Sequence, residues 1–322
     1  MSLDVSAGKF LLDLHRESRR MPHAGFRARA YEELRQCIGF DSWFWMRGAM
    51  VNDQLSVHDY HLEGQPGSLM EEYLARELWR DDLMKVGIMA APGKAFRESA
   101  AGPWPHRWHD FLRRHGQQRL MSIILTDVAP QLFAVFSLYR TDLQQPFSDD
   151  DAALFEVLTP HINDAWCENW LRERLKPTAR PSVFSSAVLA KDATLTLAQH
   201  DFAEKLQVEW PQWRGPFLPP VLKSALDESA PLWRSERITV YVQPWADGTT
   251  LLRIRTHHAF DGLPARQREA AERFAGGASQ TEVAHQMQLA SSTVNNYLLE
   301  IYRTLGIASK VELARLLEHL QS

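Results

Sequence analysis

The chain has 322 residues, of which 45% are hydrophobic and 24% charged, and its formal net charge is −4. These values exclude a disordered chain, and the length favours two or three soluble domains. No stretch approaches the roughly 20 apolar residues of a membrane span, and the charged N-terminal helix is unlike a signal peptide. Cys37 and Cys167 lie far apart without zinc-like spacing, so we expect two buried thiols in a reducing cytoplasm.

The first region, placed at residues 1–175, mixes helices and strands. Apolar periodicity predicts helices and strands in an order interrupted by a helix-rich insertion. The predicted helices are 10–17 and 26–37, and the predicted strands are 42–47, 55–61, 121–125 and 131–139. Ser148, followed by three aspartates, predicts the start of a long last helix. This order resembles the GAF fold, which implies a ligand-sensing α/β domain.

Aromatic residues are concentrated in this region, and the chain has 11 Trp in all. An aromatic-rich insertion over a sheet is typical of concave, mostly apolar ligand pockets. For each residue taken singly, an ordinary core position is the alternative. We predict a pocket for a flat apolar or aromatic effector, lined by Trp43, Trp45, Tyr60, Trp79, Asp82, Trp104, Trp108, Phe136 and Tyr139.

Catalytic and metal sites are weakly indicated. His106 and His109 are three residues apart, which places two imidazoles on one helix face, but no third ligand has a matching spacing. The acidic run at 149–151 opens a helix and is explained by capping. The sequence has no phosphate-binding glycine loop and no nucleophile elbow, so we expect no enzyme activity, no cofactor and no metal.

The middle region, 182–257, follows a proline-containing linker at 176–181. Residues 188–197 predict two short strands with a turn, and 200–206 predict a helix. Two further strands, 238–243 and 250–255, are joined across Asp247-Gly248, a strong hairpin signal. The pattern resembles a small PAS-like domain, which implies relay or dimerisation, with a second pocket as the alternative. A second break at 257–264 precedes the last region.

The last region, 263–322, has the layout of a four-helix domain. Good helix formers at 265–275 end at two glycines. Residues 279–282, Ser-Gln-Thr-Glu, have the spacing of a capping box and start a second helix. The polar turn 289–292 precedes a third helix predicted over 293–304, and a fourth amphipathic helix follows Gly306. In the third helix the apolar spacing leaves an outward face of Thr293, Asn295, Asn296 and Leu299.

These residues resemble the LuxR/FixJ/NarL-type helix-turn-helix of bacterial transcription factors from Leu263 to about Arg315. In that family the third helix enters the major groove and the fourth commonly packs against its symmetry mate. The resemblance implies base contacts by Asn295, Asn296 and Leu299, and contacts near phosphates by Thr293, Arg303 and Thr281. It rests on Leu263, Arg266, Glu269, Ala275, Gly277, Ser279, Glu282, Val283, Ala284, Thr293, Val294, Ile301, Tyr302, Arg303, Leu305, Gly306 and Leu313.

The departures from the family concern charge and ligand. Family members usually have basic residues where this chain has Thr281, Ser292, Asn295 and Thr304. No Lys or Arg occurs from 274 to 302, so neutralisation of DNA phosphates is expected to be small. In the first region, Asp82 lies near the acidic position of the acyl-homoserine-lactone receptors but has no Pro after it, so that ligand is not carried over.

Taken together, the sequence predicts a multidomain α+β protein with a GAF-like sensor, a PAS-like domain and a C-terminal all-α helix-turn-helix domain. The expected function is a cytoplasmic, ligand-responsive transcription regulator. Its expected partners are double-stranded DNA, a small-molecule effector, a second copy of the chain and the transcription machinery, with no membrane. The alternatives are a regulator that acts by protein–protein interaction through a weakly DNA-binding output domain and, less favoured, a metal-dependent or hydrolytic enzyme.

Overall fold

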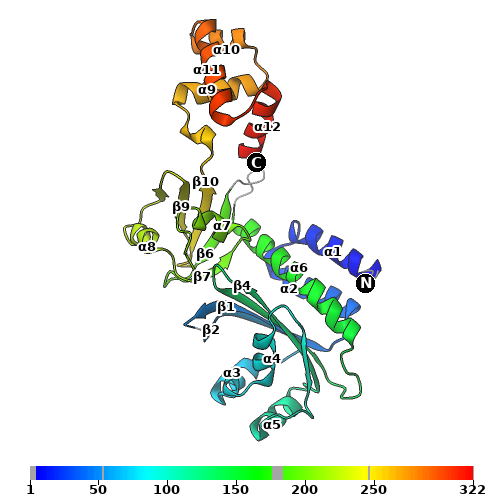
Figure 1. Ribbon diagram of the computed structural model, residues 1–322. Helices are drawn as coiled ribbons and strands as arrows, with labels where there is room; N and C mark the ends of the chain where they lie inside the picture. Colours follow the sequence, from blue (N-terminus) through cyan, green and yellow to red (C-terminus); the bar gives the residue numbers. More distant parts are fainter. Residues whose placement is uncertain (1–4, 53, 176–183, 246, 322) are drawn as a thin grey trace. The chain divides into compact units, whose positions relative to one another are not determined.

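Figure 1 shows the computed structural model of the chain, which describes residues 5–52, 54–175, 184–245 and 247–321. The chain divides into two compact units, each described below by itself. The first consists of residues 1–176, 188–199 and 214–218, and the second of residues 177–187, 200–213 and 219–322. The predicted linker at 176–181 lies outside the described residues, and the three-domain division stays a prediction. Within the described ranges, no helix is long and apolar enough to cross a membrane.

The first unit is built around a five-stranded antiparallel sheet in the order β2-β1-β5-β4-β3. All four predicted strands are present, and β3 is an addition that is short and charged. Side chains on a strand alternate between faces, so Trp43 and Trp45 point to one side of β1 and Phe44 and Met46 to the other. The strands are β1 (Ser42–Val51), β2 (Gln54–Glu63), β3 (Phe96–Ser99), β4 (Arg119–Asp127) and β5 (Leu132–Arg140).

Helices cover both faces of this sheet (Figure 1). On one face lie α1 (Val5–Ser18), α2 (His23–Cys37) and α6 (Asp149–Arg174). On the other lies the insertion, made of α3 (Ser68–Ala75), η1 (Leu78–Arg80), α4 (Leu83–Ala90) and α5 (His106–Arg114). The predicted start of α6 is confirmed, because Ser148 Oγ accepts from the Asp151 amide at 3.0 Å and the Asp151 carboxylate accepts from the Ser148 amide at 2.8 Å.

A second five-stranded sheet has the order β7-β6-β10-β9-β8. The predicted hairpin is present: β9 and β10 pair antiparallel, and Gly248 adopts a positive φ of 82° in the turn. Helix α8 and strand β8 were not predicted from the sequence, and the PAS-like likeness stays a prediction. The elements are β6 (Ser185–Leu189), β7 (Leu195–Ala198), α7 (Phe202–Gln207), α8 (Pro220–Asp227), β8 (Leu232–Arg234), β9 (Ile238–Pro244) and β10 (Thr250–Thr256).

The C-terminal region is helical, so the mixed α+β class with a helical end is confirmed. A 3-10 turn, η2 (Ala259–Gly262), leads into α9 (Ala265–Ala275), α10 (Gln280–Met287), α11 (Ser291–Leu305) and α12 (Lys310–Gln321). Helix α11 begins at Ser291, two residues before the predicted start, so Ser291 and Ser292 belong to the helix and not to the turn. Gly306 ends α11 with a φ of 67°, as predicted.

Candidate DNA-binding face and sensor cluster

One apolar cluster fixes the orientation of the C-terminal helices. Helix α11 contributes Val294, Leu298 and Ile301, which repeat at four and three residues and therefore lie on one side of the helix. They pack with residues of α9, α10 and α12. Because this side of α11 is held in the core, the opposite side is presented to solvent.

The turn between α10 and α11 is held by polar contacts. The predicted capping box is present: Ser279 Oγ accepts from the Glu282 amide at 3.3 Å, and the Glu282 carboxylate accepts from the Ser279 amide at 2.7 Å. Gln280 donates from Nε2 to the carbonyl of Ser291 at 3.1 Å, which joins the starts of the two helices. Gln288 ends α10 with a left-handed φ of 54°. These contacts set the angle at which α11 follows α10.

The solvent side of α11 carries a stripe of five exposed residues. They follow the i, i+3, i+4, i+7, i+11 spacing that keeps side chains on one helix face. Within the described part of the chain, neither amide of the stripe has a hydrogen-bond partner. We call this stripe the α11 face; it consists of Ser292, Asn295, Asn296, Leu299 and Arg303.

The structure places four of the six predicted DNA contacts on this face, Asn295, Asn296, Leu299 and Arg303. Thr281 is exposed on α10, whereas Thr293 is half-buried and lies off the face. Ser292 joins the face because α11 starts earlier than predicted. Its position four residues before Asn296 was the signal in the sequence that would have placed it there.

Three of the six Lys and Arg side chains of residues 263–322 are already engaged. Arg266 and Arg273 both pair with Glu269, at 3.4 and 2.9 Å. Lys310 donates to the backbone carbonyls of the Gly277-Ala278 turn at 3.0 and 2.8 Å and lies over the ring of Phe274. A phosphate would therefore have to compete with Glu269 or with the turn carbonyls for these three side chains.

Helix α11 itself carries two charged residues, Glu300 and Arg303. Glu300, beside the face, accepts a hydrogen bond from Gln267 Nε2 at 2.5 Å. Arg268, Arg303 and Arg315 have no carboxylate partner among the residues that the structure describes. The face therefore has one cation at its end, Arg303, and neutral amide, hydroxyl and apolar groups along the rest of its length.

The second candidate site lies under the insertion of the first unit. There a buried cluster joins the sheet to α3, η1, α4 and α5. Trp104 and Trp108 lie with ring centroids 4.7 Å apart, and Trp108 meets Phe111 edge-on. We call this group the sensor cluster; it consists of Phe44, Leu69, Met70, Leu78, Met84, Trp104, Trp108, Phe111, Leu112, Leu120 and Tyr139.

The structure does not bring all the predicted pocket residues together. Trp104, Trp108 and Tyr139 belong to the sensor cluster, and Asp82 lies at its edge through Tyr73. Tyr60 and Trp79 are 44% and 39% exposed, and of these Tyr60 approaches the ring of Phe44. The remaining three predicted residues, Trp43, Trp45 and Phe136, pack against one another on the other face of the sheet, the one covered by α1, α2 and α6. Strand alternation causes this division.

Two adjacent carboxylates join the helices of the insertion. Asp82 Oδ1 caps α4 by accepting from the amides of Met84 and Lys85, and Oδ2 accepts from the Tyr73 hydroxyl at 2.8 Å. Burial raises the pKa of the Asp82 carboxyl and that of the Tyr73 phenol. Asp82 therefore accepts three hydrogen bonds, one from α3 and two from α4, and holds these two helices together.

Asp81 faces α5 instead. Its carboxylate accepts from Trp108 Nε1 at 3.0 Å and from the Arg107 guanidinium at 2.6 Å. The hydrogen bond from Arg107 is the main reason that the pKa of Asp81 is lowered. Asp81 therefore anchors one indole of the sensor cluster in a fixed orientation.

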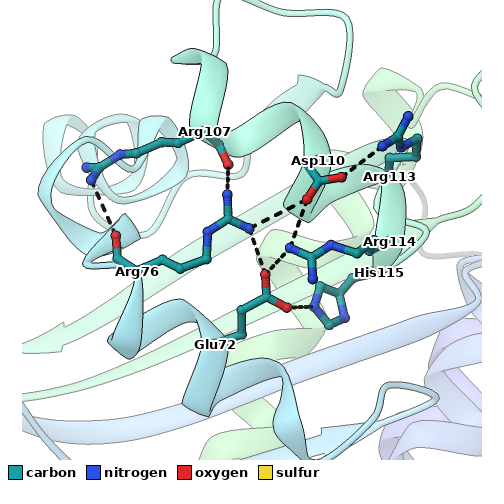
Figure 2. Close-up of polar contacts among 7 residues, drawn as sticks. All are labelled: Glu72, Arg76, Arg107, Asp110, Arg113, Arg114 and His115. Atoms are coloured by element: carbon teal, nitrogen blue, oxygen red, sulfur yellow. Dashed lines mark hydrogen bonds and ion pairs between the residues drawn. The ribbon is translucent and has the colours of Figure 1, made fainter.

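A polar network closes the insertion between α3 and α5 (Figure 2). Glu72 accepts from Arg76 at 2.7 Å, from Arg114, and from His115 Nε2 at 3.0 Å. Burial raises the pKa of Glu72, but the hydrogen bonds from Arg76 and His115 outweigh it, so the pKa is lowered. We call this network the Glu72 clasp; Arg107 and Asp110 extend it, since Arg76 donates to the Arg107 carbonyl and Arg114 reaches Asp110 at 3.0 Å.

The two histidines considered as a metal pair are neighbours on α5. The ring centroids of His106 and His109 are 6.2 Å apart. Across the described ranges, no group of three or more His, Cys, Asp or Glu side chains is placed to hold a metal ion. The polar residues of α5 instead serve the Glu72 clasp.

Comparison with known proteins places the C-terminal helices in a family. Residues 261–317 match the family model described as bacterial regulatory proteins, luxR family. Helices α9 to α12 are therefore a LuxR-family helix-turn-helix domain. No curated protein sequence matches the chain.

Similar solved structures include a LuxR family transcription factor, SdiA and a GAF domain. CepR2 from Burkholderia cenocepacia, titled an N-acylhomoserine lactone dependent LuxR family transcription factor, shares 14% identity over 54% of this chain and 100% of its own, with a TM-score of 0.40. SdiA from Escherichia coli shares 11% identity over 95% and 94% of the two chains, with a TM-score of 0.40. A phycoerythrobilin-bound GAF domain of a cyanobacterial phytochrome shares 11% identity over 54% of this chain and 100% of its own, with a TM-score of 0.36.

Proposed function

We propose that this chain, whose C-terminal helices are a LuxR-family helix-turn-helix domain, is a ligand-responsive transcription regulator that binds duplex DNA. The observation that carries the proposal is the α11 face: an exposed helical stripe whose two amides have no hydrogen-bond partner among the described residues. Unengaged amides on a helix of this domain type are suited to base edges in the major groove. The side chains of Arg303, Thr281 and Thr293 would lie near the phosphate backbone of the DNA.

The regulator would act as a homodimer on a two-fold site, because one domain with few free cations has little affinity of its own. Helix α12 supports this assembly, since its Val311 is 61% exposed beside a buried Leu313. The DNA site would fix the position of the dimer, and from there the dimer would either recruit the transcription machinery or exclude it.

The sensor cluster is the proposed site of the effector. Its neighbouring indoles and apolar side chains suit a flat apolar or aromatic molecule, and the Tyr73–Asp82 pair supplies polar groups at its edge. An effector that prefers one arrangement of the output domains would shift the balance between them. The Glu72 clasp joins α3 to α5, and such a molecule would have to pass the insertion that these helices form.

Selection from a random duplex pool with the full-length protein tests the DNA part of the proposal. We expect an enriched two-fold sequence at low salt. Failure to enrich any duplex would reject DNA binding and would favour a regulator that acts through protein contacts.

Titration with aromatic compounds, sterols and acylated signals tests the effector part. A binding compound should change Trp fluorescence and raise the melting temperature, because ligand that binds only the folded state stabilises it. Mass spectrometry of small molecules released from the purified protein identifies the chemical class directly. If no compound changes either signal and none is released, the sensor cluster is an ordinary core.

A further inference from the structure

We infer that the α11 face reads adenine–thymine base pairs by direct contact and draws little of its affinity from phosphates. This inference rests on the proposed DNA binding and names the kind of sequence that the same face would select. It follows from which side chains of the domain are free and which are already engaged.

The amides of the face have the chemistry for adenine. An Asn side chain can donate to N7 and accept from the N6 amino group of adenine at the same time, a pairing that no other base offers in the major groove. Asn295 and Asn296 are exposed, and in the described part of the chain no donor or acceptor occupies them. Both therefore remain available for base edges.

The apolar member of the face points to thymine. Leu299 is 59% exposed, so its apolar side chain is accessible to a partner. It lies three residues after Asn296 and four after Asn295, so all three side chains share one surface. The 5-methyl group of thymine is the apolar feature of the major groove, and Leu299 next to two amides matches it.

The face offers little to guanine and little to phosphate. The commonest contact to guanine is a bidentate Arg or Lys, and the only cation of the face is Arg303 at its C-terminal end. Arg266, Arg273 and Lys310 are held by Glu269 and by backbone carbonyls. Three arginines of the domain, Arg268, Arg303 and Arg315, pair with no carboxylate among the described residues, so each domain releases few counterions.

The experiment measures binding of the full-length protein to the duplex that it selects, together with Asn295→Ala, Asn296→Ala and the exposed off-face control Thr304→Ala. We expect adjacent A·T pairs in each half-site. Each Asn→Ala variant should lose about tenfold or more of its discrimination at one A·T pair, whereas Thr304→Ala should keep it. Circular dichroism checks that all variants are folded.

Asn296→Asp gives a readout that a merely structural role would not change. A carboxylate accepts from the cytosine amino group but cannot donate to adenine N7, so the preference at that position should move from adenine toward cytosine. The dependence of log K on log salt should have a slope no steeper than about −3 per domain, because three cations contribute about −0.9 each.

The outcomes separate this inference from the proposed function. An enriched site without A·T pairs at the contacted positions, unchanged specificity in both Asn→Ala variants, or a salt slope several times steeper overturns the inference while DNA binding stands. Absence of any enriched duplex overturns both.

Discussion

Helices α5 and α11 use their polar residues in opposite ways. Helix α5 holds three Arg, two His and one Asp in nine residues, yet its charged groups reach Glu72, Asp81 and Asp110 inside the same unit. Helix α11 has a single Arg in 15 residues, yet its amides point to solvent and are not engaged by the described chain. The many charged side chains of α5 therefore serve the structure of the first unit. The α11 amides without partners indicate the candidate function instead.

The contrast has a physical reason. A side chain that already makes hydrogen bonds must lose them before it can bind a partner, so its net gain on binding is small. A free amide has only water to displace. The predictions below test whether α5 acts on stability and α11 on recognition.

The largest effect is expected for Trp108→Ala. The substitution removes a buried indole from the sensor cluster and its hydrogen bond to Asp81, so the free energy of unfolding should fall by about 3–5 kcal/mol. Denaturant unfolding of the full chain, followed by circular dichroism, measures this loss. The control is Trp79→Ala, a Trp that is 39% exposed. Equal losses in both variants would contradict the assignment of Trp108 to a packed cluster.

A smaller loss of unfolding free energy is expected when the Glu72 clasp is disrupted. Glu72→Gln leaves Arg76, Arg114 and His115 without their shared carboxylate, and partial exposure of the arginines limits the cost to about 1–2 kcal/mol. Glu71→Gln is the matched control, because Glu71 is the exposed neighbour on the same helix. The clasp would have no structural role if both variants unfolded at the same denaturant concentration.

The pH dependence should follow the carboxylate of Asp81. Its pKa is lowered in the folded state, so the stability it contributes is present above the ordinary pKa of Asp and is lost as the pH falls through the lowered value. Because the side chain is 37% exposed, the effect should stay below about 1 kcal/mol. Asp81→Asn should flatten the stability profile between about pH 5 and pH 2 relative to the unsubstituted chain. A profile that stays equally steep in Asp81→Asn assigns the dependence to other groups.

The smallest effect on stability is expected for Asn296→Ala. The residue is exposed and its amide is not engaged within the described chain, so the free energy of unfolding should change by no more than about 0.5 kcal/mol. Thermal unfolding of the full chain checks this. A loss as large as that of Glu72→Gln would place Asn296 in the structure and remove the contrast between α5 and α11.

The sequence was sufficient where a local signal marks the start, turn or end of an element. The capping signals at Ser148 and Ser279, the Asp-Gly hairpin and the C-cap at Gly306 are local, and each is found where it was predicted. Elements such as β3 and β8 were missed, since strands of four and three residues carry too little periodicity to be recognised.

The candidate sites were predictable only in part. Spacing within one helix predicts which residues share a face, so Asn295, Asn296 and Leu299 of the α11 face could be predicted from the sequence. Ser292 was missed because the helix starts earlier than predicted, and Thr293 was wrongly included. Long-range contacts are not encoded in local spacing. The sequence therefore could not tell that Trp43 and Trp45 lie across the sheet from Trp104, or that the charges of α5 meet Glu72.

The most direct test of the central claim uses the selected duplex with 7-deazaadenine in place of adenine at the contacted positions. This base keeps Watson–Crick pairing but lacks the N7 acceptor in the major groove. If the α11 face reads adenine through its amides, the full-length protein should bind the substituted duplex about tenfold or more weakly, and Asn295→Ala or Asn296→Ala should remove that difference at one position each. Equal affinity for the two duplexes would contradict base reading by α11.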